Sequence, residues 1–194
     1  MTLSTLDPKT ALVVIDLQGG TVATPKVPVP VEEVVARTVE LAAAFRAHGL
    51  PVVLVRVTAA ADGADATPGR IGAQRRSGGG ALPEGFDVIL EELRGENDII
   101  VSKRTWGAFY GTDLDLQLRR RGVTQVVLAG VATSIGVEST ARAAHEHGYH
   151  VTLATDAMTD INEETHRNSI ERIFPMLGES GTTAEIIELL AKTR

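Results

Sequence analysis

"TQVVLAGVATSIGVEST", residues 124–140, joins an apolar run to a stretch with helical character. The run 126–129 predicts a buried strand, and Glu138 begins a segment that predicts a helix. A sharp turn from strand to helix is where many enzymes hold a nucleophile. Here the tip of the turn reads Ser134-Ile135-Gly136, which raises the question of what group the turn presents.

The rest of the chain repeats this pattern of strand followed by helix. Four further apolar runs are "ALVVID" (11–16), "PVVLVRV" (51–57), "DIIVSK" (98–103) and "YHVTLATD" (149–156). They are apolar nearly throughout, which is typical of parallel strands covered on both faces. Helical segments are expected at 30–49, 111–122, 136–148, 162–177 and 183–193. The alternation predicts a single domain over residues 1–194, with a three-layer α/β/α fold and a mostly parallel, doubly wound sheet of about six strands.

Composition narrows the classes of function. The chain has 194 residues, a net charge of −6 and no cysteine. The charge provides no broad basic surface for nucleic acid, and no apolar run is long enough to predict a membrane span. The start of the sequence lacks the pattern of a secretory signal, so we expect a cytoplasmic protein that acts on a small molecule. Without cysteine, disulfides, thiolate metal sites and thiol mechanisms are excluded.

One segment differs from the rest. Residues 58–85 are rich in alanine and glycine, include "RRSGGG" and are too long for a plain connection, which predicts a mobile loop or a lid. Arg70, Arg75 and Arg76 lie within it. They could bind an anion or form a solvated cluster of charges, and the sequence favours the second reading slightly.

Polar residues gather at the predicted strand ends. The first strand ends at Asp16, the third at Lys103 and the fourth in the turn 130–136, and Arg56 lies near the end of the second. Because ligands bind at the carboxyl ends of strands in an open α/β sheet, these groups should converge on one crevice. Asp16 could instead cap a turn and Lys103 could be surface charge. Asp156, at the end of the fifth strand, is expected to be structural.

Three stretches together resemble a known family. They are "LVVIDLQ" (12–18), "VSKRTWGAFYGTDLDLQLRRRGVTQVVLAG" (101–130) and "GVATSIGVESTARAAHEHGYHVTLATDAMTD" (130–160). In this order they resemble the isochorismatase-like hydrolase superfamily, which includes nicotinamidases, N-carbamoylsarcosine amidase, ureidoacrylate amidohydrolase and isochorismatase. The resemblance runs from about Ala11 to the C-terminus and is weakest across 58–97. It suggests a homo-oligomer, a dimer or a tetramer.

The resemblance also assigns roles. Most members carry an Asp–Lys–Cys triad, which falls here on Asp16, Lys103 and Gly136, so amide hydrolysis through a thioester is excluded. Isochorismatases resemble this chain in having glycine at that position, and they cleave a vinyl ether. This reaction needs a proton donor and water but no covalent intermediate. The resemblance implies Asp16 as the general acid and Lys103 as its partner or as a group that orients a substrate carboxylate. Backbone N–H groups of the helix after Gly136 would hold an anionic oxygen.

The same resemblance implies the surroundings of the site. We expect Gln18, Arg56, Trp106, Ala132 and Ile135 to bind an anionic substrate. A non-proline cis peptide is implied between Val131 and Ala132. Gly19 and Gly20 replace larger residues and leave the neighbouring pocket wall undefined. No metal or cofactor is expected, because the five histidines lie away from the position where nicotinamidases hold a metal; they are His48, His145, His147, His150 and His166.

The leading interpretation is an isochorismatase-type hydrolase that cleaves a vinyl (enolpyruvyl) ether of a small carboxylated substrate. Two alternatives stay open. One is an amidohydrolase of the same superfamily with a mechanism that does not use cysteine, for example through Ser134 or Ser139, although no histidine is placed to activate either. The other is a binding protein that kept Asp16 and Lys103 but lost the chemistry.

Overall fold

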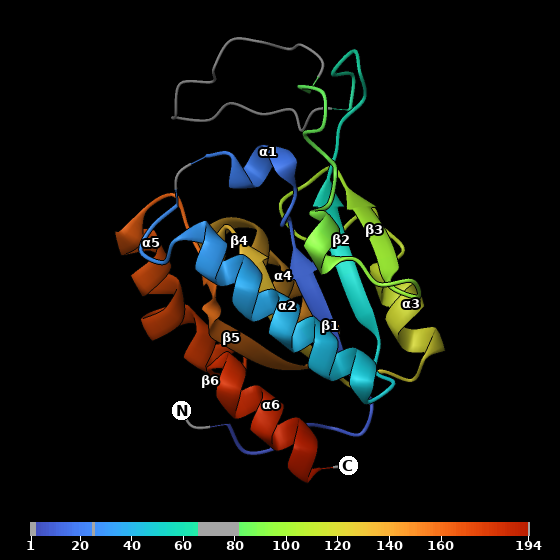
Figure 1. Ribbon diagram of the computed structural model, residues 1–194, viewed down its shortest axis with the longest axis vertical. Helices are drawn as coiled ribbons and strands as arrows, with labels where there is room; N and C mark the ends of the chain where they lie inside the picture. The colour runs from blue at the N-terminus through green and yellow to red at the C-terminus, as the bar shows by residue number, and fades with distance from the viewer. Residues whose placement is uncertain (1–2, 25, 66–81, 194) are drawn as a thin grey trace.

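The computed structural model describes residues 3–24, 26–65 and 82–193. Its centre is a six-stranded sheet in the order β3-β2-β1-β4-β5-β6, in which every neighbouring pair is parallel (Figure 1). The strands are β1 (Thr10–Ile15), β2 (Val52–Val57), β3 (Ile99–Lys103), β4 (Gln125–Val131), β5 (His150–Thr159) and β6 (Glu179–Gly181). The predicted α/β fold with a parallel sheet is confirmed. The sequence did not indicate β6, which has only three residues.

Helices cover both faces of the sheet, which explains why its strands are apolar throughout. In β1, Ala11, Val13 and Ile15 belong to one hydrophobic cluster, whereas Leu12 and Val14 belong to another. Successive side chains of a strand point to opposite faces, so each face of the sheet has its own core. The sheet is therefore the middle layer of three, as predicted.

The two outer layers come from different parts of the chain. α2 (Val31–Ala47) and α6 (Thr183–Lys192) pack side by side over one face, and α3 (Leu114–Arg120) and α4 (Glu138–Glu146) cover the other (Figure 1). α1 (Gly19–Val22) is a short helix beyond the carboxyl end of β1. The described helices also include a 3-10 turn, η1 (Glu91–Leu93), and a π turn, η2 (Thr133–Val137).

The helix predicted over 162–177 is present but divided. Its parts are α5 (Glu163–Asn168), the π turn η3 (Ser169–Ile173) and the 3-10 turn η4 (Phe174–Met176). Asn162 begins it by accepting the N–H groups of Glu164 and Thr165. Pro175 lies in η4, where its missing N–H and its ring disfavour a continuous α-helix.

The strand order creates the crevice. From β1 the chain first proceeds toward β3 on one side and then returns to β4 on the other, so the order reverses between β1 and β4. Ligands bind at the carboxyl ends of strands at such a switch point. The two strands approach closely at Gly130, where φ is 114° and an added Cβ would lie 2.1 Å from the carbonyl oxygen of Ile15. Only glycine fits there.

Two expectations concern the surface. The mobile loop or lid predicted over 58–85 lies largely outside the described residues, which include only 58–65 and 82–85 of that segment; Arg70, Arg75 and Arg76 are not among them. Within the described part of the chain, the helices are too short or too polar to cross a membrane.

Candidate active site

Asp16 and Lys103 meet at the carboxyl end of the sheet. Lys103 Nζ donates a 2.7 Å hydrogen bond to Asp16 Oδ2 and a 3.0 Å bond to the carbonyl oxygen of Thr105. Both side chains are buried, with only 6% of Asp16 and 2% of Lys103 exposed. Asp16 follows β1 directly in a left-handed conformation (φ 51°) that is uncommon outside glycine. The convergence expected from the strand ends is therefore present for this pair.

The electrostatics of the pair favour a proton donor. Burial raises the pKa of the Asp16 carboxyl to about 6, even though the charge and hydrogen bond of Lys103 act to lower it. Asp16 Oδ1 is buried and has no hydrogen-bond partner among the described residues. A buried oxygen without a partner is costly in the ionised state, and protonation removes part of that cost. Asp16 can therefore hold a proton near neutral pH and donate it.

A pocket of about 320 Å³ opens beside this pair. Its lining includes Gly136 and three of the predicted substrate-binding residues, Trp106, Ala132 and Ile135. Trp106 forms the rim, with 67% of its surface exposed. Gly20, which the sequence placed beside the pocket wall, also lines it. The lining residues that the sequence analysis did not identify are Thr21, Thr24, Lys26, Val57, Phe86, Thr105, Val131 and Ile161.

Gly136 is adjacent to the carboxylate. A Cβ added at this position would lie 3.3 Å from Asp16 Oδ2 and 2.9 Å from Ile15 Cγ2. A cysteine at position 136 would therefore lie next to Asp16, as expected for the Asp–Lys–Cys triad of the family that the sequence resembles. With glycine at this position, the space beside the carboxylate is part of the pocket. The peptide bond between Val131 and Ala132 is cis, which confirms the expectation for this turn.

The backbone donors predicted after Gly136 are engaged elsewhere, and this expectation was wrong. The helical conformation begins at Thr133, as the π turn η2, and continues into α4. Val137 N–H donates to the carbonyl oxygen of Ala132, and Glu138 N–H donates to those of Ile135 and Thr133. Because the helix starts three residues before Gly136, the amides that follow Gly136 are already bonded within it.

Gln18 does not line the pocket, which corrects the second expectation. Its side chain is fully buried and donates to the carbonyl oxygens of Val57 and Phe86, both at 2.9 Å. Its amide oxygen accepts the N–H of Val57 at 2.8 Å. The side chain of Gln18 therefore connects the chain after β1 to the backbone of Val57 and Phe86. Both of these residues line the pocket, so Gln18 supports the pocket wall without contributing to its surface.

Arg56 is also directed away from the pocket. Its guanidinium donates to Ser102 Oγ at 2.9 Å and to the carbonyl oxygen of Asp87, and it lies 3.7 Å from the carboxylate of Asp87. Neighbouring residues of a strand face opposite sides, and here it is Val57 that lines the pocket. The sequence located the end of β2 correctly but did not show that Val57, rather than Arg56, faces the pocket.

Phe86 supplies the wall that Gly20 leaves open. A Cβ at Gly20 would lie 1.9 Å from Phe86 Cδ2, so the ring occupies the place of a larger side chain at position 20. Gly20 N–H donates to the Phe86 carbonyl oxygen at 2.9 Å, which keeps the two segments together. The contact joins residues 66 positions apart, and no local sequence signal reports it.

The serines and histidines do not form a second catalytic group. Neither Ser134 nor Ser139 lines the pocket. The Ser134 N–H donates to the buried carboxylate of Asp160 at 2.6 Å, and His166 Nδ1 lies 2.9 Å from Thr133 Oγ1, behind the turn. Within residues 3–24, 26–65 and 82–193, no three His, Asp or Glu side chains cluster as metal ligands would. Asp156 accepts the N–H and hydroxyl of Thr183 at the start of α6, which is the structural role expected.

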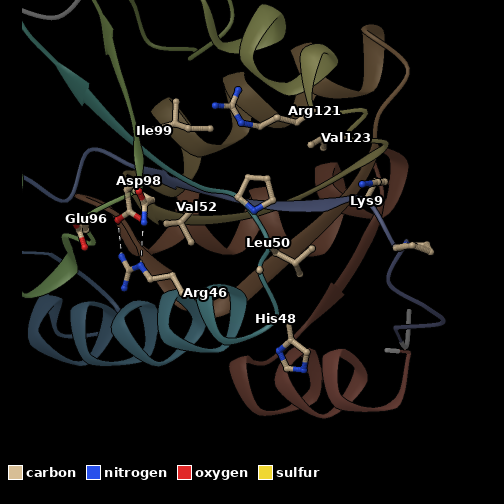
Figure 2. A pocket seen from close by; sticks show the side chains of 14 residues that line it. Lys9, Arg46, His48, Leu50, Val52, Glu96, Asp98, Ile99, Arg121 and Val123 are labelled. Carbon is tan, nitrogen blue, oxygen red and sulfur yellow. Dashed lines mark hydrogen bonds and ion pairs between the residues drawn. The ribbon is translucent and has the colours of Figure 1, made fainter.

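A larger cavity of about 710 Å³ lies at the opposite end of the sheet, where β1, β2 and β3 begin (Figure 2). Arg46 and Asp98 form an ion pair of 2.6 Å on its wall, and Lys9, His48 and Arg121 also line it. The last turns of α2 and α3 end here, so Arg46 and Arg121 lie near the negative ends of the two helices. The arrangement is that of a stabilising surface and contains no acid–base pair comparable to Asp16 and Lys103.

Fold and site together define a class: a doubly wound α/β protein with a buried Asp–Lys pair at the switch point and glycine at the adjacent turn. Residues 10–185 match the isochorismatase domain. The chain belongs to the isochorismatase family, a family of hydrolases, and it has Gly136 and no cysteine where the triad's nucleophile would lie.

Relatives support this membership along the chain. The isochorismatase family protein YecD of Escherichia coli O157:H7 is 47% identical over 182 residues, which cover 93% of this chain and 96% of YecD. The solved structure of an isochorismatase family protein from Burkholderia thailandensis is 44% identical, with a TM-score of 0.92 and coverage of 96% and 98% of the two chains.

Relatives with named activities match over shorter stretches. Nicotinamidase 3 of Arabidopsis thaliana is 38% identical over 85 residues, or 42% of this chain and 43% of its own. Phenazine biosynthesis protein PhzD1 of Pseudomonas aeruginosa is 31% identical over 108 residues, or 56% of this chain and 52% of its own. The family therefore contains different activities, and the residues of this site must distinguish among them.

Proposed function

We propose that this protein hydrolyses a vinyl (enolpyruvyl) ether of a small carboxylated substrate, with Asp16 as the general acid and without a covalent intermediate. Two features of the site carry the proposal. Asp16 is buried, which raises its pKa to about 6, and the adjacent turn has Gly136, where an added Cβ would lie 3.3 Å from Asp16 Oδ2. The site has a proton donor and open space, but no side-chain nucleophile at position 136.

The reaction follows from these groups. Asp16 transfers its proton to the terminal methylene carbon of the enolpyruvyl group, and the C=C electron pair forms the new C–H bond. The resulting oxocarbenium ion is attacked by water at the carbon next to the ether oxygen, and the water proton returns to the Asp16 carboxylate. The hemiketal then breaks its bond to the ether oxygen: the hydroxyl group becomes the carbonyl of pyruvate, and its proton passes to the leaving oxygen, which departs as an alcohol. No step requires a group from residue 136.

Lys103 has two functions in this scheme. Its hydrogen bond to Oδ2 holds the Asp16 carboxyl in place beside the pocket. Its positive charge also stabilises the carboxylate that remains after proton transfer. Hydrolysis of an amide is less compatible with this site, because the amide carbonyl requires a nucleophile to form a tetrahedral adduct. Neither Ser134 nor Ser139 lines the pocket to provide one.

The direct test is a substrate screen. The purified protein is incubated with isochorismate and other enolpyruvyl ethers, and pyruvate release is followed by a coupled assay. Nicotinamide and ureidoacrylate are included, with ammonia release as the readout. We expect pyruvate from at least one ether and no ammonia; ammonia release without pyruvate would refute the proposal.

A further inference from the structure

We propose that Lys26 binds the carboxylate of the substrate and thereby selects carboxylated over neutral molecules. This inference deepens the proposed function and rests on its assignment of a carboxylated substrate to the pocket. It assigns the anion-binding role, predicted for the amides after Gly136 and for Arg56, to a residue that the sequence analysis did not consider.

The first observation is the position of Lys26. It lines the same pocket as Asp16 and Lys103, although it comes from the segment between α1 and α2. Its neighbour Val27 forms an antiparallel bridge with Asp160, with N–H···O distances of 2.8 Å and 2.9 Å in the two directions. The bridge holds Lys26 against the chain that follows β5 and places it on the pocket wall.

The second observation is the state of its ammonium group. Lys26 Nζ donates to the carbonyl oxygens of Thr21 at 2.5 Å and Thr24 at 2.7 Å. These partners are neutral. An ammonium group has three N–H donors, and the described residues accept two of them, which leaves one for a ligand. No carboxylate of the described residues forms an ion pair with Lys26. Burial lowers the pKa of Lys26, and the charge of Asp160 acts in the opposite direction.

The third observation is the balance of charge and surface in the pocket. Lys103 already donates hydrogen bonds to Asp16 Oδ2 and to the carbonyl oxygen of Thr105. Among the described residues, Lys26 is the other cation in the lining. Most of the remaining wall is apolar and includes Val57, Phe86, Trp106, Val131, Ile135 and Ile161. A pocket of this kind fits a mostly hydrocarbon molecule with one anionic group, and a carboxylate hydrogen-bonded to an ammonium is the matching pair.

The test measures binding rather than turnover. Trp106 is the only tryptophan of the chain and lies on the pocket rim, so its fluorescence reports occupancy of the pocket. The probes are cyclohex-1-ene-1-carboxylate and its carboxamide, which differ mainly in charge. We expect the wild type to prefer the carboxylate, and Lys26→Met to weaken carboxylate binding by about tenfold or more without changing carboxamide binding. Lys26→Arg should restore much of the preference.

The control is Lys9→Met, which removes a lysine at the opposite end of the sheet and should bind both probes as the wild type does. Equal loss of both probes in Lys26→Met would show that Lys26 only supports the chain around Thr21 and Thr24. Unchanged carboxylate binding in that variant, or a wild type without a preference for the carboxylate, would also overturn the inference. The binding test does not depend on turnover. If the protein binds the carboxylate through Lys26 but releases no pyruvate in the substrate screen, the proposed function is refuted and the role of Lys26 in binding is supported.

Discussion

Lys103 reaches Asp16 across an intervening strand. Asp16 follows β1 and Lys103 ends β3, while β2 lies between them, and Lys103 is in register with Val57 of β2. Neighbouring strands are about 4.8 Å apart, so the bond requires a side chain that extends over the end of β2. A lysine has that length. The ammonium reaches the carboxylate at 2.7 Å while its backbone remains part of the sheet.

The first prediction concerns the pH dependence of turnover. A general acid must be protonated, and the pKa of Asp16 is raised to about 6 by burial. The rate constant for ether cleavage should therefore be highest below pH 6 and fall by up to about tenfold per pH unit above it. Pyruvate release measured from pH 5 to pH 8 tests this, with substrate stability checked in protein-free controls. A rate that rises across this range would assign Asp16 the role of a base.

Asp16→Asn should abolish turnover and preserve the fold. Asparagine has nearly the same shape but cannot donate a carboxyl proton, and general acid catalysis contributes roughly 10²- to 10⁴-fold. Asp87→Asn is a matched control, because Asp87 lies near the same end of the sheet but pairs with Arg56 outside the pocket. Pyruvate release and circular dichroism are measured on both variants. Comparable turnover in Asp16→Asn and the wild type would remove Asp16 from the mechanism.

Replacement of Lys103 should shift the pH profile. The charge and hydrogen bond of Lys103 lower the pKa of Asp16 against the effect of burial. In Lys103→Met both effects of Lys103 are lost, and burial is opposed only by the backbone of Val57, so the midpoint of the profile should move upward by about one pH unit or more. Lys103→Arg keeps the positive charge and should keep the midpoint closer to that of the wild type. An unchanged midpoint in Lys103→Met would mean that another group controls the profile.

Gly136 tests whether open space matters. In Gly136→Ala the new Cβ would lie 2.9 Å from Ile15 Cγ2 and 3.3 Å from Asp16 Oδ2, so we expect ether cleavage to fall by about tenfold or more. Gly136→Cys should lose the same activity and gain a thiol near Lys103. The positive charge favours the thiolate, and the thiol should react with iodoacetamide. Full ether turnover in either variant, or an inert thiol in Gly136→Cys, would contradict this account of the turn.

Asp16 should also make stability depend on pH. Its pKa in the folded protein, about 6, exceeds the unfolded value of 3.8, so the folded state binds the proton more tightly. The stability that this group contributes is fully present below pH 3.8 and is lost as the pH rises through about 6. The loss is on the order of 3 kcal/mol. The free energy of unfolding of the wild type and of Asp16→Asn is measured with urea at several pH values. As the pH rises through this window, the wild type should lose stability relative to the variant. A difference between the two proteins that does not change with pH would contradict this prediction.

The sequence by itself determined the architecture and brought Asp16 and Lys103 together. Continuous apolar runs identify parallel strands covered on both faces, because burial on two sides requires apolar residues at every position. Asp16 and Lys103 could be placed together because parallel strands end at one edge of a sheet. Gly136 could be located because its position is defined along a continuous stretch of chain, from the strand at Val126 to the helix at Glu138.

Only the tertiary structure decided which other side chains line the pocket. The orientation of Arg56 depends on Asp87, and that of Gln18 on the backbone of Val57 and Phe86. Phe86 and Lys26 reach the pocket through contacts between segments far apart in the chain, such as the bridge of Val27 to Asp160. The direction of a side chain follows from its hydrogen bonds and packing partners, whereas local sequence patterns report only which face of its own element is buried.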